Sequence, residues 1–178
     1  MKLLFTIDKK NYKEGGTVGR RPSVRGIVLQ DGKVAMMHSR QYGYYKLPGG
    51  GMEKNETHID TLIREVAEES GLQVIPSSVR PFGYVRRIEK GAREDIFLQE
   101  NFYFFCQAES TLLPQKLDDY EAEEGFTLVF VTPLEGIRLN EQALPHLPED
   151  NPRRITMIQR ENSVLALIDK HMKENGPA

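Results

Sequence analysis

Short apolar runs that end at turn-forming residues recur between residues 23 and 133. In "SVRGIVLQDGKVAMMHS" two runs flank Asp31-Gly32, a dipeptide that favours a tight turn because both of its residues tolerate positive φ. The stretch therefore predicts two strands joined as a hairpin. A second, longer hairpin is predicted over "RPFGYVRRIEKGAREDIFLQENFYFFCQA", turning near Gly91, and "EGFTLVFVTP" predicts a strand that ends at Pro133.

Helical spacing of apolar residues marks two other segments. From residue 57 to 71 the i, i+3, i+4, i+7 pattern predicts a helix whose buried face holds Ile59, Leu62, Ile63 and Val66. Thr57 is its predicted N-cap, with Asp60 as partner in a variant capping box, and Gly71 is its predicted C-terminal stop. Residues 153–174 predict a long C-terminal helix with a face of Ile155, Ile158, Leu165, Ile168 and Met172.

Strands and helices interleave along the chain, which favours an α/β layered fold. A length of 178 residues suits one domain with a sizeable core, so we expect a single domain over 1–178. Within it, "LEGIRLN" predicts a short helix. Residues 1–20 keep two interpretations: "KLLFTID" is either an edge strand or an arm exchanged in a dimer, and "KKNYKEGG" is loop.

Charge and cysteine content narrow the classes of function. A net charge of −2 gives no general attraction to nucleic acid, so a nucleic-acid partner is not expected. The apolar stretch Leu3–Ile7 is too short for the core of a signal peptide, and no segment has the length of a membrane span. Cys106 is the single cysteine, which excludes an internal disulfide. Its apolar neighbours predict a buried thiol, and a reducing, cytoplasmic location fits.

Three glutamates crowd the first predicted helix. Glu65, Glu68 and Glu69 repel one another, and at helical spacing they fall within an arc of about 100° beside the loop "KLPGGG". Clustered carboxylates are hard oxygen ligands that suit Mg²⁺ or Mn²⁺, and such ions bind substrate phosphates. The spacing alone thus predicts a divalent-metal site for a phosphate-containing substrate. The alternative is a solvated helix face.

A longer pattern decides between these two interpretations. Gly50, five residues, Glu56, seven residues and then "REVAEESGL" (residues 64–72) resembles the complete signature of the Nudix hydrolases. At ordinary residue frequencies a chance match in this chain is below about one in a million. The resemblance covers 23 residues directly, from Gly50 to Leu72. It implies an α/β/α sandwich around a central mixed β-sheet, and the predicted hairpins and final helix suit that fold.

The resemblance also implies a reaction and its residues. Nudix hydrolases cleave a pyrophosphate bond in a nucleoside diphosphate linked to another group, with Mg²⁺, or Mn²⁺ as a substitute. Carried onto this sequence, the metal ligands would be the carboxylates of Glu65, Glu68 and Glu69 and the carbonyl of Gly49. Glu65 is also a candidate base. Arg64 would hold Glu65 or pair with Glu56, which would support the helix and the metal shell.

Family members often draw a further carboxylate from a downstream loop, and "LDDYEAEEGFTLVFV" is the obvious source here. Counting back from the strand favours Glu124, with Glu121 and Glu123 as alternatives, while a solvated loop is the competing interpretation. Candidate substrate-binding residues near the site are Arg25, Arg40 and Lys46 for phosphate oxygens and Tyr45, or its neighbours Tyr42 and Tyr44, for a base. Surface solvation, or packing for the tyrosines, is the alternative.

The substrate follows only from absent motifs. There is no proline between Pro81 and Pro114, where the ADP-ribose branch carries one, and the tags of other branches are missing too. A (d)NTP or related small nucleotide is therefore the expected substrate. One alternative is the 5′-triphosphate end of RNA, because "VRRIEKGAR" is locally basic. Another is a non-enzymatic nucleotide sensor on the same fold. A homodimer is compatible with the sequence.

Overall fold

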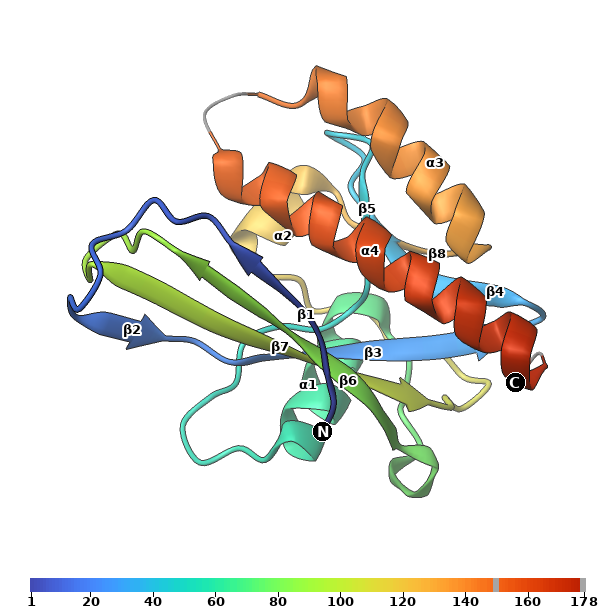
Figure 1. Cartoon of the computed structure of the whole chain (residues 1–178). Helices are drawn as coiled ribbons and strands as arrows, with labels where there is room; N and C mark the ends of the chain where they lie inside the picture. The colour runs from blue at the N-terminus through green and yellow to red at the C-terminus, as the bar shows by residue number, and fades with distance from the viewer. Residues whose placement is uncertain (149–150, 177–178) are drawn as a thin grey trace.

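The computed structural model describes residues 1–148 and 151–176, and the strands within them pair into an eight-stranded sheet (Figure 1). The strands are β1 (Leu3–Asp8), β2 (Val18–Arg20), β3 (Ser23–Gln30), β4 (Lys33–His38), β5 (Tyr45–Lys46), β6 (Arg80–Glu89), β7 (Ile96–Cys106) and β8 (Thr127–Val131). The helices are α1 (His58–Ser70), α2 (Asp119–Glu124), α3 (Pro133–Ala143) and α4 (Pro152–Asn175), with short 3₁₀ turns η1 (Pro76–Ser78) and η2 (Leu144–His146).

The sheet is mixed, as predicted. Its strands follow the order β1-β6-β7-β3-β4-β5, with β2 also on β7 and β8 also on β4. The pairs β1–β6, β2–β7 and β3–β7 are parallel, and the other pairs are antiparallel. Both predicted hairpins are confirmed: β3 turns into β4 at Asp31-Gly32, and β6 turns into β7 near Gly91.

The first hairpin opens as it leaves its turn, and this positions the site. β3 and β4 pair only at Leu29–Val34 and Gln30–Lys33. The first half of β3 therefore has a free edge, and the glycine loop occupies it: Val24 N donates to Gly50 O and Gly26 N donates to Pro48 O, both at 2.9 Å. Because the loop takes the place of a strand, its backbone is fixed against the sheet.

Helices cover both faces of the sheet (Figure 1). Leu62 and Val66 of α1 are fully buried, in a cluster with residues of β3, β4 and β7. On the opposite face, α4 buries Ile158, Leu165 and Ile168 completely, as its periodicity predicts. Ile155 and Met172 of the same predicted face are partly buried. The α/β/α sandwich is thus confirmed. None of the helices within the described ranges is both long and apolar enough to cross a membrane.

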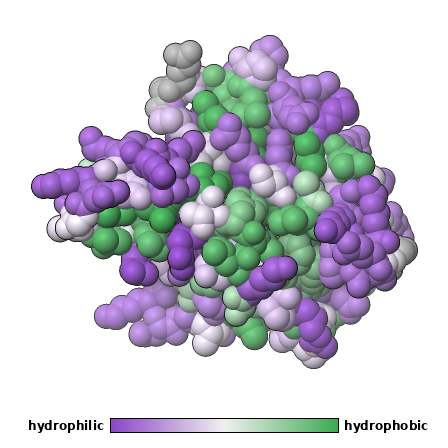
Figure 2. Space-filling view, in the orientation of Figure 1, coloured by the Kyte–Doolittle hydropathy of each residue, from purple (hydrophilic) through white to green (hydrophobic). Residues whose placement is uncertain are grey.

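The N-terminal segment forms an edge strand within this chain, one of the two interpretations left open by the sequence. β1 pairs in parallel with β6 from Leu3–Tyr84 to Asp8–Ile88. Leu4, Phe5 and Ile7 pack against the core. Figure 2 shows hydrophobic residues gathered near the centre of the view. The projecting end of the β6–β7 hairpin, at the left of the same view, is covered by hydrophilic residues.

The predicted ends of α1 are confirmed. The Thr57 side chain accepts from Asp60 N, the Asp60 side chain accepts from Thr57 N, and Gly71 ends the helix with a φ of +77°. One residue of its predicted buried face, Ile59, is 43% exposed, so the apolar face is a turn shorter than expected. Cys106 is buried as predicted, and burial raises the pKa of its thiol to about 12.

One predicted loop is a helix. Asp118 caps α2 in a capping box with Glu121, and Gly125 ends it in the left-handed region. The sequence contained this signal, because an acidic residue followed three positions later by glutamate is typical of a helix start. The prediction of a loop over this segment was wrong. The choice of Glu124 as the downstream carboxylate was made on that prediction, and Glu124 does not line the cavity described below.

Two glycines in the same backbone conformation give a matched stability test. Gly71 and Gly32 have φ values of +77° and +72°, but a Cβ on Gly71 would collide with the carbonyl oxygen of Leu113, while one on Gly32 would meet no atom within 4 Å. We expect Gly32→Ala to lower the free energy of unfolding by about 1–2 kcal/mol. Gly71→Ala should cost at least about 1 kcal/mol more, because the clash adds to the backbone strain.

Urea denaturation of the two variants measures this difference directly. Equal losses in both variants would show that the Leu113 carbonyl moves aside and that the segment after α1 is not held in place.

Candidate functional site

A cavity of about 490 Å³ lies where the glycine loop meets α1, the start of β3 and α2. Its lining includes the loop residues Gly49, Gly50 and Gly51 and a group of charged side chains. Six of these are acidic and four are basic: Glu53, Glu65, Glu68, Glu69, Asp118, Glu121, Arg21, Arg25, Arg64 and Lys116. The three signature glutamates therefore do face one space, beside the loop that precedes them.

Glycine is required in the loop for close approach. Gly49 has a φ of +136°, and a Cβ there would collide with the backbone of Val24 and Arg25. A Cβ on Gly50 would collide with the carboxylate of Glu65. The loop thus presses against β3 on one side and against the acidic face of α1 on the other.

Arg64 organises the outer half of the site. Its Nε donates to Glu56 Oε1 at 2.6 Å, and its Nη1 donates to Glu65 Oε1 at 2.8 Å and to Glu68 Oε2 at 3.1 Å. Its Nη2 donates to Gly51 O at 3.2 Å. Of the two alternatives for Arg64, holding Glu65 or pairing with Glu56, the structure shows both at once. The hydrogen bond from Arg64 lowers the pKa of Glu56 to about 2.

Lys46 organises the inner half. Its Nζ lies 2.9 Å from Glu69 Oε1 and 2.7 Å from Glu121 Oε1, and all three side chains are almost completely buried. The second oxygen of Glu69 accepts from Gly49 N at 3.0 Å. Burial raises the pKa of Glu69 to about 7, against the opposing charges of Lys46 and Arg25. Burial also acts to raise the pKa of Glu121, but the charge of Lys46, together with hydrogen bonds to Glu69, Lys46 and Tyr120, holds this pKa at about 2.

Arg25 binds the backbone of the glycine loop. Its Nη1 donates to the carbonyl oxygens of Leu47, at 3.2 Å, and Gly49. The Gly49 carbonyl, which the resemblance assigns to a metal, therefore points to a guanidinium here. Arg25 also lines the cavity, so it is the one predicted phosphate-binding cation that reaches it.

A second layer, from α4, was not predicted. Glu161 is fully buried; its Oε2 accepts from Leu47 N at 3.0 Å and its Oε1 accepts from Arg160 Nη2 at 2.7 Å. Arg160 Nη1 continues to Asn101 Oδ1 at 2.7 Å, which also accepts from Ser23 Oγ. The sequence carried one signal for this: Glu161 lies three residues after Ile158, on the apolar face of the helix.

Glu124, predicted as a catalytic and metal-binding carboxylate, lies elsewhere. It is buried and accepts hydrogen bonds from Tyr44 Oη at 2.7 Å, Ser39 Oγ at 3.1 Å and Arg154 Nη2 at 3.0 Å. It does not line the cavity, whereas Glu121 does. The two carboxylates have different partners, Lys46 for Glu121 and Arg154 for Glu124, and it is the alternative, Glu121, that faces the cavity.

Three predicted substrate-binding residues are not among the residues that line the cavity. Lys46 is 3% exposed and is bound to carboxylates. Tyr45 stacks on His38 at 4.5 Å, and its backbone bonds to Asn140. Arg40 packs near Gly125 and is absent from the lining. The aromatic ring that does line the cavity is Tyr120, which is 53% exposed and was not predicted.

The carboxylates do not yet converge on one point. In the described residues no group of three acidic, histidine or cysteine side chains stands ready to hold a metal ion. The reason is visible in the contacts: Arg64 draws Glu65 and Glu68 to one side, and Lys46 draws Glu69 to the other. The donor chemistry still fits a hard divalent ion, because glutamate oxygens face a shared cavity.

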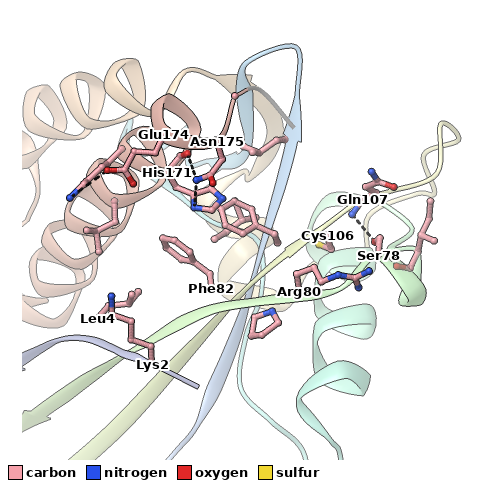
Figure 3. Close-up of a pocket in the computed structure, with 18 of the residues that line it drawn as sticks. Lys2, Leu4, Ser78, Arg80, Phe82, Cys106, Gln107, His171, Glu174 and Asn175 are labelled. Carbon is pink, nitrogen blue, oxygen red and sulfur yellow. Dashed lines mark hydrogen bonds and ion pairs between the residues drawn. The ribbon is translucent and has the colours of Figure 1, made fainter.

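A larger cavity, about 990 Å³, lies between η1, β6 and the end of α4 (Figure 3). Phe82 and His171 both pack on Phe105, with ring centroids 5.0 and 4.7 Å away, and Cys106 lies among the lining residues. Among the described residues that line this cavity, Glu174 alone has a carboxylate, and it pairs with Lys170. Size alone does not make it the chemical site, since it lacks clustered metal ligands.

Comparison with known proteins tests the resemblance that the signature suggested. The family model described as NUDIX domain matches residues 19–158, which include the whole signature. The chain belongs to the Nudix family. Among solved structures, a NUDIX hydrolase from Nitrosomonas europaea has a TM-score of 0.56 at 21% identity, covering 89% of this chain and 93% of that one. A MutT protein from Bacillus halodurans has a TM-score of 0.53 at 22% identity, covering 67% and 72%. These likenesses support the Nudix fold.

Curated relatives of this Nudix protein match over shorter stretches. A protein named RNA pyrophosphohydrolase from Stenotrophomonas maltophilia (strain K279a) is 30% identical over 118 residues, or 60% of this chain and 56% of the relative. The uncharacterized Nudix hydrolase YvcI from Bacillus subtilis (strain 168) is 42% identical over 53 residues, or 29% of this chain and 34% of the relative. The chain spans about half the length of the first of these relatives.

The second layer yields a stability prediction. Glu161→Ala leaves Arg160 buried without its carboxylate and Leu47 N without its acceptor, so we expect a loss of about 3–5 kcal/mol in the free energy of unfolding. Glu174→Ala is the matched control on the same helix, because its partner Lys170 is exposed. There the expected change is within about 0.5 kcal/mol. Urea denaturation compares the two, and a small loss in Glu161→Ala would contradict the role given to this layer.

Proposed function

We propose that this Nudix protein is a Mg²⁺-dependent pyrophosphohydrolase that cleaves a phosphoanhydride bond of a nucleoside diphosphate derivative. The observation that carries the proposal is the common cavity of Glu65, Glu68 and the glycine loop. Family membership supports the same reaction class. The non-enzymatic alternative is disfavoured, since each signature carboxylate is present and Glu65, Glu68 and Glu69 face the cavity.

The proposed metal ligands are the side chains at the cavity end of α1. Glu65 and Glu68 would hold Mg²⁺ with the oxygens that Arg64 does not take. Bound there, Mg²⁺ neutralises phosphate charge and makes a coordinated water more acidic. The inner carboxylates Glu69 and Glu121 are already bridged by Lys46.

The chain's own groups then carry the reaction. Glu65 takes the proton of the attacking water, and burial raises the pKa of this carboxyl, which favours accepting a proton. The water oxygen forms a bond to one phosphorus, and the bond from that phosphorus to the bridging oxygen breaks. Arg64 keeps Glu65 in place through the 2.8 Å contact. Arg21 and Lys116, on the cavity lining, meet the phosphate oxygens, and Tyr120 offers a ring to the base.

A small (d)NTP remains the first proposed substrate, and the 5′-triphosphate end of RNA is the second. The names of the relatives favour RNA. The basic stretch "VRRIEKGAR" adds little support, because Arg86 pairs with Glu100 at 2.8 Å and the buried Arg87 pairs with Glu89 at 2.5 Å. These two guanidinium groups are occupied within the protein.

The role of the α1 carboxylates is tested by Glu68→Gln, which keeps the side chain's size and removes its charge. We expect kcat to fall by at least about a hundredfold with far-UV circular dichroism unchanged, because a charged ligand of the metal is lost. Glu141→Gln, on the exposed face of α3, is the matched control and should keep full activity. Unimpaired turnover in Glu68→Gln would refute the proposed site.

The substrate is tested with purified protein, Mg²⁺ and a panel of nucleoside triphosphates, ADP-ribose, nucleotide sugars, dinucleoside polyphosphates and a 5′-triphosphate oligonucleotide. We expect a nucleoside monophosphate and pyrophosphate from the triphosphates, separated by chromatography. Assays at two salt concentrations distinguish RNA, since contacts to its backbone make KM rise steeply with salt. Preference for the oligonucleotide at low salt would select the second substrate, and no product from any member would contradict the proposed function.

A further inference from the structure

Lys46 is buried at the centre of the acidic cluster. Its side chain is 4% exposed, and its ammonium bridges Glu69 and Glu121, which belong to different helices. The same Nζ lies 4.6 Å from the centroid of the Phe126 ring, within the range of a cation–π contact. Placing a charge here has a high desolvation cost, and the two carboxylates are what offsets it.

The contacts of Lys46 are those that a metal ion would otherwise make. One ammonium draws together one oxygen from each of two buried carboxylates, at 2.9 and 2.7 Å. The remaining oxygen of Glu69 is taken by Gly49 N at 3.0 Å. A divalent ion at this end would therefore have to displace a buried cation first.

The net charge of the cavity is also consistent with a single divalent ion. Its lining carries six acidic and four basic side chains. Lys46 and Glu56, which contact lining residues from behind, add one charge of each sign. With every group ionised the excess is two negative charges, which equals the charge of a single divalent ion. Without Lys46 the excess would be three, and Glu69 Oε1 would lose its cation while Glu121 Oε1 kept only the hydrogen bond from Tyr120 Oη.

We infer that Lys46 is a built-in cation that fills the Glu69–Glu121 end of the centre, so that the protein holds a resident divalent ion only at the Glu65–Glu68 end. This inference rests on the proposed function, because it assigns metal ligands within the same site. Lys46 is thus a positioning residue: it fixes where the ion sits and joins α2 to α1.

The test counts bound ions and needs no substrate. Mn²⁺ is titrated into the protein, and the electron paramagnetic resonance signal of free Mn²⁺ gives the number bound per chain. We expect Lys46→Met, which keeps the length of the side chain, to bind one more Mn²⁺ than the unmodified protein. The additional ion should be lost again in Lys46→Met combined with Glu121→Gln.

The cavity provides a matched control. Lys116→Met also removes one positive charge from the site, but its side chain is exposed on the cavity lining and is not placed between the two carboxylates. It should leave the number of bound ions unchanged, so a general effect of charge is separated from the specific place of Lys46. Far-UV circular dichroism shows whether each variant is folded.

Two results would overturn the inference. The first is a folded Lys46→Met that binds no more Mn²⁺ than the unmodified protein. The second is the loss of an ion when Glu121→Gln is introduced alone, with Lys46 still present, and this second test holds even if Lys46→Met does not fold. Both differ from a failure of the proposed function, which would appear as absence of hydrolysis whatever the number of bound ions.

Discussion

The rest of the site depends on the two contacts made by the carboxylate of Glu69. One of its oxygens binds the ammonium of Lys46 and the other binds the amide of Gly49, so a single side chain joins α1 to β5 and to the glycine loop. The same ammonium extends the connection to Glu121 of α2. Because the group is almost fully buried, each lost contact would leave an unpaired polar atom in an apolar setting, and the arrangement tolerates little variation.

Two cations divide the acidic cluster between them. Arg64 pairs with the outer carboxylates, and its side chain is partly exposed, so water can replace these ion pairs. Lys46 pairs with the inner carboxylates, Glu69 and Glu121, and these side chains are almost completely buried. The outer half is therefore the part that can rearrange around a ligand, while the inner half acts as its fixed support. This division assigns different tasks to glutamates that are adjacent in the sequence.

Local patterns predicted the elements well, and they failed where a contact joins distant segments. The capping box at Thr57, the turn at Asp31-Gly32 and the acidic face of α1 are each specified by neighbouring residues. The positions of Lys46 and Tyr45 are not, because adjacent residues of a strand point to opposite faces and only the assembled sheet decides which face meets the carboxylates. The displacement of Glu124 had a local cause, namely an unrecognised helix start at Asp118.

The bond from Leu47 N to Glu161 spans 114 residues of sequence, which has a consequence for synthesis in the cell. The loop leaves the ribosome long before the helix that supports it. At about 5–20 residues per second, the loop waits roughly 6–23 s for its partner. During that interval Leu47 N lacks its acceptor on Glu161, and the loop has only its contacts with β3 and α1. The candidate site is thus among the parts of the nascent chain that become fully ordered late, because one of its supports is translated near the end of the chain.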